Sequence, residues 1–324
     1  MMPSASRPGA AWSAAFSSAP PSAMQVYAEV MVPRMFEPWG RELLGELAVE
    51  AGEAVLDVAC GPGSVTRLAA AQTGPTGRVT GCDLSPAMLA IAIGRVPVPN
   101  GAAIDYLDAP ADRLPVPDGS FDVATCQQGL QFFPDRLAAL AEIHRALRPG
   151  GRIGVAVWKR IAECPPFAVL AEAIRQVAGS ELADRYAGGP WGLPLASDLR
   201  AVLEGAGFAD IRVEDRVLPV TFEGGPAQLA ATLAAAGVAA ELEALSPQDK
   251  DRLQAAVTEL SRPLMAGGAL RSQLASHLAI GIRRLTGQPD HSPPRWPRAA
   301  ATASRRVSRV PAANTSSKRS APSA

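Results

Sequence analysis

The feature that most constrains this chain is an alternation of short apolar runs with amphipathic stretches over residues 54–158. Apolar runs of strand length occur at 54–59, 78–82, 103–107, 121–127 and 152–158. Most of these runs are separated by stretches of helical periodicity. Because parallel strands are joined by crossover connections, this rhythm predicts a parallel sheet with helices on both faces. The chain is therefore expected to have an α/β fold.

The composition supports a folded chain whose body is acidic. Of 324 residues, 48% are apolar and 19% are charged, which is enough to bury a sizeable core. The 31 basic and 31 acidic side chains balance, but residues 288–324 hold seven of the basic ones and one acidic one. The rest of the chain is therefore net acidic. Such a surface repels phosphate backbones, so no nucleic-acid partner is expected.

The cysteines and the apolar runs exclude several other classes. Four cysteines occur without a CxxC motif or a nearby histidine pair, at Cys60, Cys82, Cys126 and Cys164. This pattern excludes a disulfide scaffold, predicts no metal site and suits a reducing compartment. No apolar run reaches the roughly 18 residues that a membrane span requires. We therefore expect a cytoplasmic protein without a membrane span.

The two ends of the chain differ from its middle. Residues 1–23 and 287–324 are rich in Ser, Ala and Pro, and arginine is frequent in the second segment. Neither segment shows apolar periodicity, so both are predicted to be disordered, the second as a basic tail. One domain is expected at 24–286, with a core at about 50–158 and an added helical lid at about 160–196.

After Lys159 the pattern of the chain changes. Residues 148–151 are interpreted as a helix stop and a turn. Helices are expected at 165–179, 197–206, 226–236 and 247–262, a Gly/Pro/aromatic-rich stretch at 180–195, and strands at 211–222 and about 274–282.

Unusual residues follow the expected strands at their carboxyl ends, where open parallel sheets bind ligands. The first strand leads into Gly61 and Gly63, whose missing Cβ atoms allow a close approach of the backbone to a ligand. The second strand ends in Asp83, twenty residues after Gly63. An acid at this spacing typically accepts hydrogen bonds from ribose hydroxyls. The pattern predicts a nucleoside-containing ligand.

A nicotinamide dehydrogenase is the alternative for such a ligand, but two residues argue against it. Thr66 stands where the dinucleotide motif requires its third glycine. Asp57 is expected in the loop that a diphosphate would occupy, and like charges at short range in a low dielectric repel strongly. A ligand with a ribose and a cationic group but no phosphate removes this conflict. S-adenosylmethionine is such a ligand.

Four sequence blocks carry a family resemblance: VLDVACGPG (55–63), GCDLSPAML (81–89), DAPADRLPVPDGSFDVATCQQGLQFFPD (108–135) and EIHRALRPGGRIGVAVW (142–158). In this order they resemble the class I S-adenosylmethionine-dependent methyltransferases, most closely the type 11 group related to ubiquinone and menaquinone biosynthesis. The resemblance implies a Rossmann-like, seven-stranded, mostly parallel sheet whose last strand is antiparallel. It also implies S-adenosylmethionine as the cofactor of a domain at 24–286.

The resemblance further implies a position for each part of the cofactor. Asp57, Ala59, Gly61 and Gly63 would border the methionine part, and Asp83 would hold the ribose hydroxyls.

At the adenine, Asp108 would accept from the exocyclic amine beside Ala109. Leu84 and Met88 fit two interpretations equally well, which are a contact with the adenine and ordinary core packing.

The end of the fourth strand and three aromatic residues are the candidates nearest the acceptor. Gln127 would line the floor beneath the sulfonium, although a shift of one residue at the strand end would exchange it with Gln128. Tyr27, Phe132 and Trp191 are candidate walls of an acceptor pocket. Aromatic residues of this kind favour a small, fairly apolar acceptor.

No residue stands out as a general base. Methyl transfer is an in-line displacement that mainly requires alignment and exclusion of water, and a base is needed only for a protonated acceptor. Tyr27 and His277 are the catalytic candidates, Tyr27 because a phenol could cap the cleft. We predict O- or C-methylation of a small-molecule acceptor. A non-catalytic S-adenosylmethionine-binding module remains the alternative, and the oligomeric state is left open.

Overall fold

The computed structural model describes residues 21–285, so the predictions for residues 1–20 and 286–324 lie outside the described residues. Helix α2 (Pro21–Val26) begins shortly before the expected domain start at Met24. One sheet contains all eight strands of the described chain, in the order β3-β2-β1-β4-β5-β8-β6, with the two-residue strand β7 paired to β8.

The sheet is mostly parallel, as predicted. Its strands are β1 (Ala54–Val58), β2 (Arg78–Asp83), β3 (Ala103–Asp108), β4 (Phe121–Gln127), β5 (Leu147–Trp158), β6 (Ala209–Phe222), β7 (Met265–Ala266) and β8 (Ala269–Ile282). The first five strands pair in parallel, whereas β8 is antiparallel to both β5 and β6. The expected antiparallel last strand is therefore confirmed, and it begins at Ala269 instead of near 274. The Rossmann-like arrangement brings the carboxyl ends of β1 to β5 to one edge.

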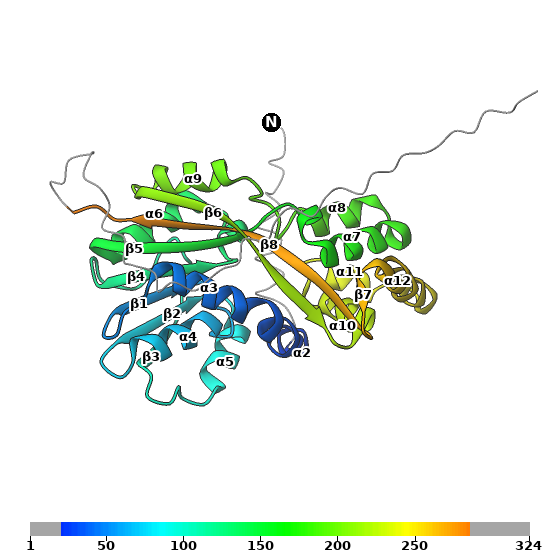
Figure 1. The fold of residues 1–324 in the computed structure, drawn as a ribbon, viewed down its shortest axis with the longest axis horizontal. Helices are drawn as coiled ribbons and strands as arrows, with labels where there is room; N and C mark the ends of the chain where they lie inside the picture. Colours follow the sequence, from blue (N-terminus) through cyan, green and yellow to red (C-terminus); the bar gives the residue numbers. More distant parts are fainter. Residues whose placement is uncertain (1–20, 286–324) are drawn as a thin grey trace, which may run out of the picture.

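Helices cover both faces of the sheet (Figure 1). On one face lie α3 (Glu37–Leu47) and α4 (Ser64–Thr73), on the other lie α6 (Arg136–Ala146) and α9 (Ala196–Gly205), and α5 (Pro86–Gly94) packs beside β2 and β3. Successive side chains of a strand point to opposite faces. Val55 therefore belongs to the apolar core on the α3 side, and Leu56 belongs to the core on the α6 side.

A continuous helical run leads into the sheet. Helix α2 passes into the π-helical segment η1 (Tyr27–Phe36), which continues into α3. The wider turn of a π-helix changes which residues face inward, and such segments occur often at functional sites. In η1, Val32, Met35 and Phe36 are buried.

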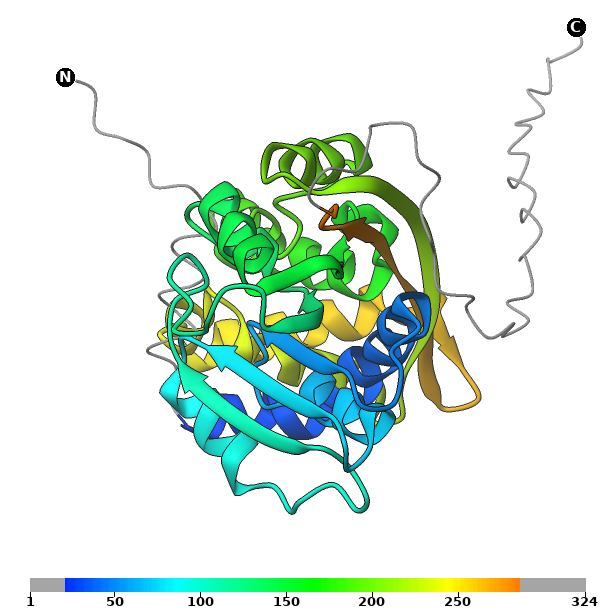
Figure 2. The same cartoon turned by 90° about the vertical axis from the view of Figure 1, so that its left-hand side faces the viewer.

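A cap of helices lies beside one end of the sheet and is built from two insertions. The first, between β5 and β6, contains η3 (Ile161–Glu163), α7 (Pro165–Ala178) and α8 (Ser180–Ala187). The second, between β6 and β8, contains α10 (Gly225–Ala231), η4 (Thr232–Ala235), α11 (Ala239–Glu243), α12 (Pro247–Leu260) and η5 (Arg262–Leu264). Helix α7 packs against both α8 and α12. Figure 1 shows β6 and β8 extending toward this cap, and Figure 2 shows the cap behind the sheet.

One local prediction was wrong, and two helical regions differ in detail from the expectation. Residues 148–151 do not form a free turn but belong to β5, because Gly150 N–H donates to Arg283 O at 2.7 Å and Arg283 N–H donates to Gly151 O at 2.8 Å. Residues 180–195, which lie within the expected helical lid, contain helix α8. The helix expected at 226–236 changes from α10 into the tighter η4 at Thr232.

Candidate functional site

A cavity of about 210 Å³ opens at the carboxyl edge of the sheet. Its lining comes from the segments that follow β1, β2, β3 and β4, together with Tyr27 from the leading helix. We call this space the first cavity. It lies where the topology of an open α/β sheet predicts a ligand.

The loop between β1 and α4 forms one wall of the first cavity. Ala59, Gly61 and Gly63 all have left-handed backbone, with φ of 58°, 55° and 77°. Ala59 and Gly61 line the cavity, but Gly63 does not. A Cβ atom at Gly63 would lie 2.4 Å from the Tyr106 hydroxyl. Glycine is therefore needed at position 63 for packing against β3, whereas the sequence suggested close approach to a ligand.

Asp57 supports this loop from beneath and does not line the cavity. It is 1% exposed. The hydroxyls of Thr66 and Thr125 donate to its two carboxylate oxygens at 2.7 and 2.8 Å. Burial raises the pKa of Asp57 to about 6, although these hydrogen bonds oppose the rise. The carboxylate thus joins β1 to α4 and β4.

Asp83 lies at the mouth of the first cavity, at the end of β2. Its carboxylate accepts hydrogen bonds from Gly61 N–H at 2.8 Å and from Ser85 N–H at 2.9 Å. Burial raises the pKa of Asp83 above its ordinary value, and these backbone donors oppose the rise. The backbone N–H of Leu84 is a third donor to this carboxylate. A carboxylate offers about four lone-pair positions, so about one stays available for a ligand.

The first cavity is acidic. Asp83, Asp112 and Asp135 line it, and no lysine or arginine does so within residues 21–285. Asp112 was not predicted, whereas the predicted Asp108 is exposed and does not line the cavity. The chain departs from the strand direction after Asp108, so the next acidic residue along the loop reaches the cavity. Ala109 lines the cavity, and so do Leu84 and Met88, for which the sequence left core packing open as an alternative.

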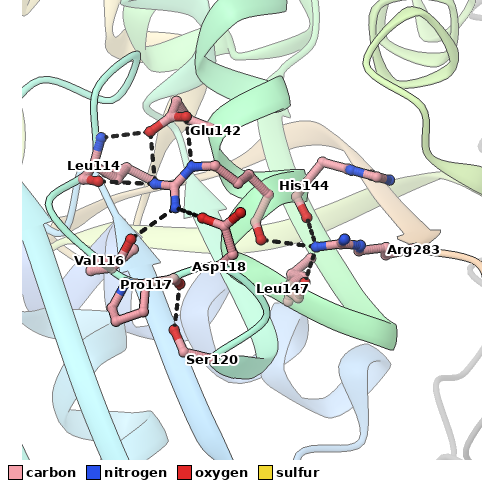
Figure 3. Close-up of polar contacts among 10 residues, drawn as sticks. Leu114, Val116, Pro117, Asp118, Ser120, Glu142, His144, Leu147 and Arg283 are labelled. Carbon is pink, nitrogen blue, oxygen red and sulfur yellow. Dashed lines mark hydrogen bonds and ion pairs between the residues drawn. The ribbon is translucent and has the colours of Figure 1, made fainter.

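The loop from Ala109 to Ser120 is held by the side chain of Arg145 (Figure 3). The guanidinium donates to Val116 O at 2.8 Å and to Leu114 O at 3.0 Å. It also pairs with Asp118 at 2.6 Å and with Glu142 at 2.8 Å. Hydrogen bonding to Arg145 holds the pKa of Glu142 below its ordinary value. One arginine of α6 thus fixes a loop whose first residues line the first cavity.

The two glutamines at the end of β4 have separate partners. Gln127 Nε2 donates to Phe36 O at 2.9 Å, on the side of the leading helix. Gln128 Nε2 donates to Ser276 Oγ in β8 at 2.7 Å. Both residues line the first cavity, but only Gln128 also lines a neighbouring one. Both glutamines, between which the sequence did not decide, therefore line the first cavity.

The neighbouring space, which we call the second cavity, has a volume of about 60 Å³ and lies beneath the cap. Half of its lining residues are aromatic: Tyr27, Phe36, Phe132, Trp158, Phe167, Tyr186 and Trp191. The others are Met31, Met35, Gln128, Pro190, Thr232, Ala235 and Ala236. No charged side chain lines the second cavity within the described part of the chain. The expected wall residues Tyr27, Phe132 and Trp191 are all present.

Three wall residues from the second insertion were missed by sequence reasoning: Thr232, Ala235 and Ala236. Their segment is rich in alanine and carries no motif. A useful signal would have been the length of chain between the last two long strands, which is enough for a second set of cap helices.

The two catalytic candidates occupy different positions. Tyr27 lines both cavities, and burial together with the nearby Asp83 raises its pKa well above the ordinary value. These surroundings favour the neutral phenol over the phenolate. His277 lines neither cavity, and its ring nitrogens lie 2.7 Å from Asp215 Oδ1 and 3.0 Å from Pro194 O. His277 is thus placed in a polar cluster beneath the cap, away from both cavities.

Other features of the described residues bear on the chemistry. All four cysteines are free and buried. Within residues 21–285, no group of three or more His, Cys, Asp or Glu side chains could hold a metal ion. A search of the helices in the same range found none with the length and apolar character of a bilayer span.

The chain is similar in sequence to known methyltransferases. A family model described as a methyltransferase domain matches residues 56–155. A demethylmenaquinone methyltransferase from Listeria welshimeri is 30% identical over 188 residues, covering 54% of this chain and 78% of that protein. A demethylmenaquinone methyltransferase from Staphylococcus aureus is 31% identical over 201 residues, covering 59% and 80%.

Solved structures share the fold. The YcgJ protein from Bacillus subtilis matches with a TM-score of 0.52 and 17% identity, covering 76% of this chain and 99% of that one. A phosphoethanolamine N-methyltransferase from Haemonchus contortus, solved with S-adenosylmethionine, matches with a TM-score of 0.54 and 18% identity, covering 84% and 60%.

Proposed function

The chain belongs to the class I S-adenosylmethionine-dependent methyltransferases, and from this membership we propose that it methylates a small, uncharged, largely apolar molecule held in the second cavity. The observation that carries the proposal is the contrast in charge between two cavities that share Tyr27, Gln128 and Phe132. An acidic cavity suits a cationic methyl donor, and an uncharged aromatic cavity beside it suits a neutral acceptor. A non-catalytic module is not favoured.

The residues of the first cavity fit S-adenosylmethionine by their charge. This cofactor carries an ammonium, a sulfonium and one carboxylate but no phosphate, so its net charge is positive and Asp83, Asp112 and Asp135 attract it. The diphosphate of a nicotinamide dinucleotide would meet the same three carboxylates without a compensating cation among the described lining residues. The charge of the cavity therefore supports the first ligand over the second.

We assign roles in the cofactor site from these positions. Asp83 would accept a hydrogen bond from a ribose hydroxyl with its remaining lone pair. Leu84, Met88 and Ala109 would contact the adenine.

Of the other residues predicted at the cofactor site, some line the first cavity and some hold the loop after β1 in place. Ala59 and Gly61 would present backbone to the methionine part, and Gln127 would line the floor. Asp57 and Gly63 act instead by holding the loop in shape.

When bound, the cofactor supplies a methyl group on a positively charged sulfur, which is activated for in-line displacement. The chain must then align the acceptor and exclude water. Tyr27 and Phe132 line both cavities and thus close the junction between them. The aromatic walls from α7, the residues around Trp191 and the second insertion shield the acceptor from solvent.

The acceptor proposed here is an oxygen-substituted ring, methylated on oxygen or carbon. Aromatic walls favour a flat apolar molecule, and the Listeria and Staphylococcus relatives are named for demethylmenaquinone. A cavity of about 150 Å³ holds benzene, whereas the second cavity measures about 60 Å³. A ring acceptor therefore requires the two cap insertions to separate slightly.

Calorimetric titration of the protein with S-adenosylhomocysteine, with NADH as the control, tests the cofactor. Micromolar binding of the first ligand alone is expected, and binding of NADH would contradict the proposal. Methyl transfer from labelled S-adenosylmethionine to 1,4-naphthohydroquinone and to phosphoethanolamine tests the acceptor class. We expect transfer only to the uncharged ring. Transfer only to phosphoethanolamine would overturn the uncharged acceptor while leaving the cofactor assignment intact.

A further inference from the structure

Gln128 occupies an unusual backbone position between the two cavities. It directly follows β4 and has a φ of 54°, in the left-handed region that side chains other than Gly and Asn rarely adopt. Its N–H donates to Ala156 O in β5 at 2.8 Å, which fixes the peptide in place. Left-handed backbone at a buried glutamine costs of the order of 1 kcal/mol. Backbone geometry alone would favour glycine here, so the side chain needs a separate explanation.

Neighbouring side chains orient the carboxamide of Gln128 but do not fill its hydrogen-bonding capacity. Its Nε2 donates to Ser276 Oγ at 2.7 Å, and Gln131 Nε2 lies 3.4 Å from its Oε1. A carboxamide has two N–H donors and two acceptor lone pairs. These contacts engage one donor and one lone pair. One donor and one lone pair therefore remain on a side chain that is only 6% exposed and lines both cavities.

Two other polar residues near the junction, Gln127 and Thr232, each line only one of the cavities. Gln127 donates to Phe36 O and lines only the first cavity. Thr232 lines the second cavity, but its hydroxyl donates to Leu229 O at 2.7 Å. Tyr27 shares the junction with Gln128, and Phe132 supplies only an apolar ring. Gln128 thus combines the shared position with spare capacity for hydrogen bonds.

We propose that the Gln128 carboxamide, oriented by Ser276, binds the oxygen substituent of the acceptor ring and so determines acceptor specificity. The inference rests on the proposed function, because it requires the second cavity to be the acceptor site. A neutral amide both donates and accepts, so it matches a hydroxyl or carbonyl without requiring a charge. A site built to bind such a group strongly rejects the analogue that lacks it, because the polar side chain is then left unpaired.

Equilibrium dialysis with two probes, 1-naphthol and naphthalene, tests this role in the presence of S-adenosylhomocysteine. The wild-type protein is expected to bind 1-naphthol about 20-fold more tightly than naphthalene, in line with one buried hydrogen bond. Gln128→Gly suits the left-handed backbone and removes the carboxamide, so it is expected to fold and to lose this preference. Ser276→Ala frees the amide and is expected to reduce the preference only in part.

A matched control separates the side chain from the backbone. Asn100 is also left-handed, with a φ of 53°, but lies in the loop before β3, outside both cavities. Asn100→Gly is therefore expected to keep the wild-type preference. A Gln128→Gly protein that still prefers 1-naphthol as the wild type does would overturn the role of Gln128 and leave the proposed function standing. A wild-type protein that binds S-adenosylhomocysteine but neither probe would overturn the proposed acceptor class, and the Gln128 role with it.

Discussion

The two cavities of this protein are adjacent, yet they are built in opposite ways. Apart from Tyr27, the first cavity takes its lining from one stretch of chain between β1 and α6, and its charged residues are all acidic. The second cavity is assembled from the leading helix, the segment after β4, the end of β5 and the two cap insertions, and its described lining is uncharged. The comparison shows that one cavity is formed by segments close together in the sequence, whereas its neighbour depends on packing between segments far apart in the sequence.

The difference also concerns stability. The first cavity is surrounded by carboxylates whose charges are costly to bury, such as Asp57 beneath the glycine loop. The second cavity is surrounded by aromatic pairs, for example Phe167 and Trp191 with ring centroids 5.4 Å apart. Ionisation of these carboxylates is therefore expected to lower the free energy of unfolding. The uncharged surroundings of the second cavity should contribute no such dependence.

The largest expected effect concerns Asp57 and the pH. Because its folded-state pKa of about 6 lies above the ordinary 3.8, the folded protein holds a proton that the unfolded chain releases. Stability from this group is complete below pH 4 and is lost as the pH rises through 6. The loss amounts to about 3 kcal/mol. Asp57→Asn has no ionisable group at this position and therefore lacks this pH dependence. The unfolding free energy of the wild type minus that of the variant should fall by about 3 kcal/mol between pH 4 and pH 7.

Urea unfolding of the ligand-free protein across this pH range measures the effect. Thr232→Val is the matched control, because Thr232 is buried beside the second cavity and carries no charge. Its difference from the wild type should be independent of pH. A difference between the wild type and Asp57→Asn that does not change with pH would show that folding does not raise the pKa of Asp57.

Substitution of Asp83 is expected to weaken ligand binding in the first cavity and to leave binding in the second cavity unchanged. Asp83→Ala removes the carboxylate that binds Gly61 N–H and Ser85 N–H and that we assign to the ribose. Loss of charge-assisted hydrogen bonds is expected to weaken S-adenosylhomocysteine binding about 100-fold, as measured by calorimetry. Binding of 1-naphthol should change less than twofold. Asp105→Ala, an exposed change in β3, is the control. Unchanged affinity for S-adenosylhomocysteine in Asp83→Ala would refute the ribose role.

The sequence predicted the cofactor side better than the acceptor side, for a physical reason. Gly61, Asp83 and Ala109 stand at strand ends, and the position of a strand end follows from short-range periodicity. The family resemblance assigned Asp108 to the adenine, whereas the structure has Asp112 at the cavity. Which acidic residue of an irregular loop reaches a cavity depends on how the loop is held. That depends on Arg145, at a distance in the chain.

On the acceptor side, the individual aromatic residues were predicted but their enclosure was not. Tyr27, Phe132 and Trp191 were identified by type and spacing, whereas Thr232 and Ala235 come from the second insertion. Their place depends on α12 packing against α7, a contact between segments about 80 residues apart. Alanine-rich helices carry no local signal for such a contact, since many helix pairings bury similar apolar faces.

The smallest expected effect tests whether the loop at the first cavity must be held in place. Arg145→Met removes the bonds to Leu114 O and Val116 O, so the loop beginning at Ala109 gains conformational freedom that ligand binding must then remove. Ordering the backbone of a single residue costs on the order of 1–2 kcal/mol, so freedom gained at about one residue predicts about tenfold weaker binding of S-adenosylhomocysteine by calorimetry. Arg145→Lys keeps the positive charge but lacks the forked donors of the guanidinium. Its affinity for S-adenosylhomocysteine should therefore lie between those of the wild type and Arg145→Met. Binding of 1-naphthol should not change, and Arg175→Met, which removes a surface pair in the cap, should alter neither affinity. Equal weakening of both ligands by Arg145→Met would mean that the two cavities are not separately built, because the damage would then have spread through the whole fold.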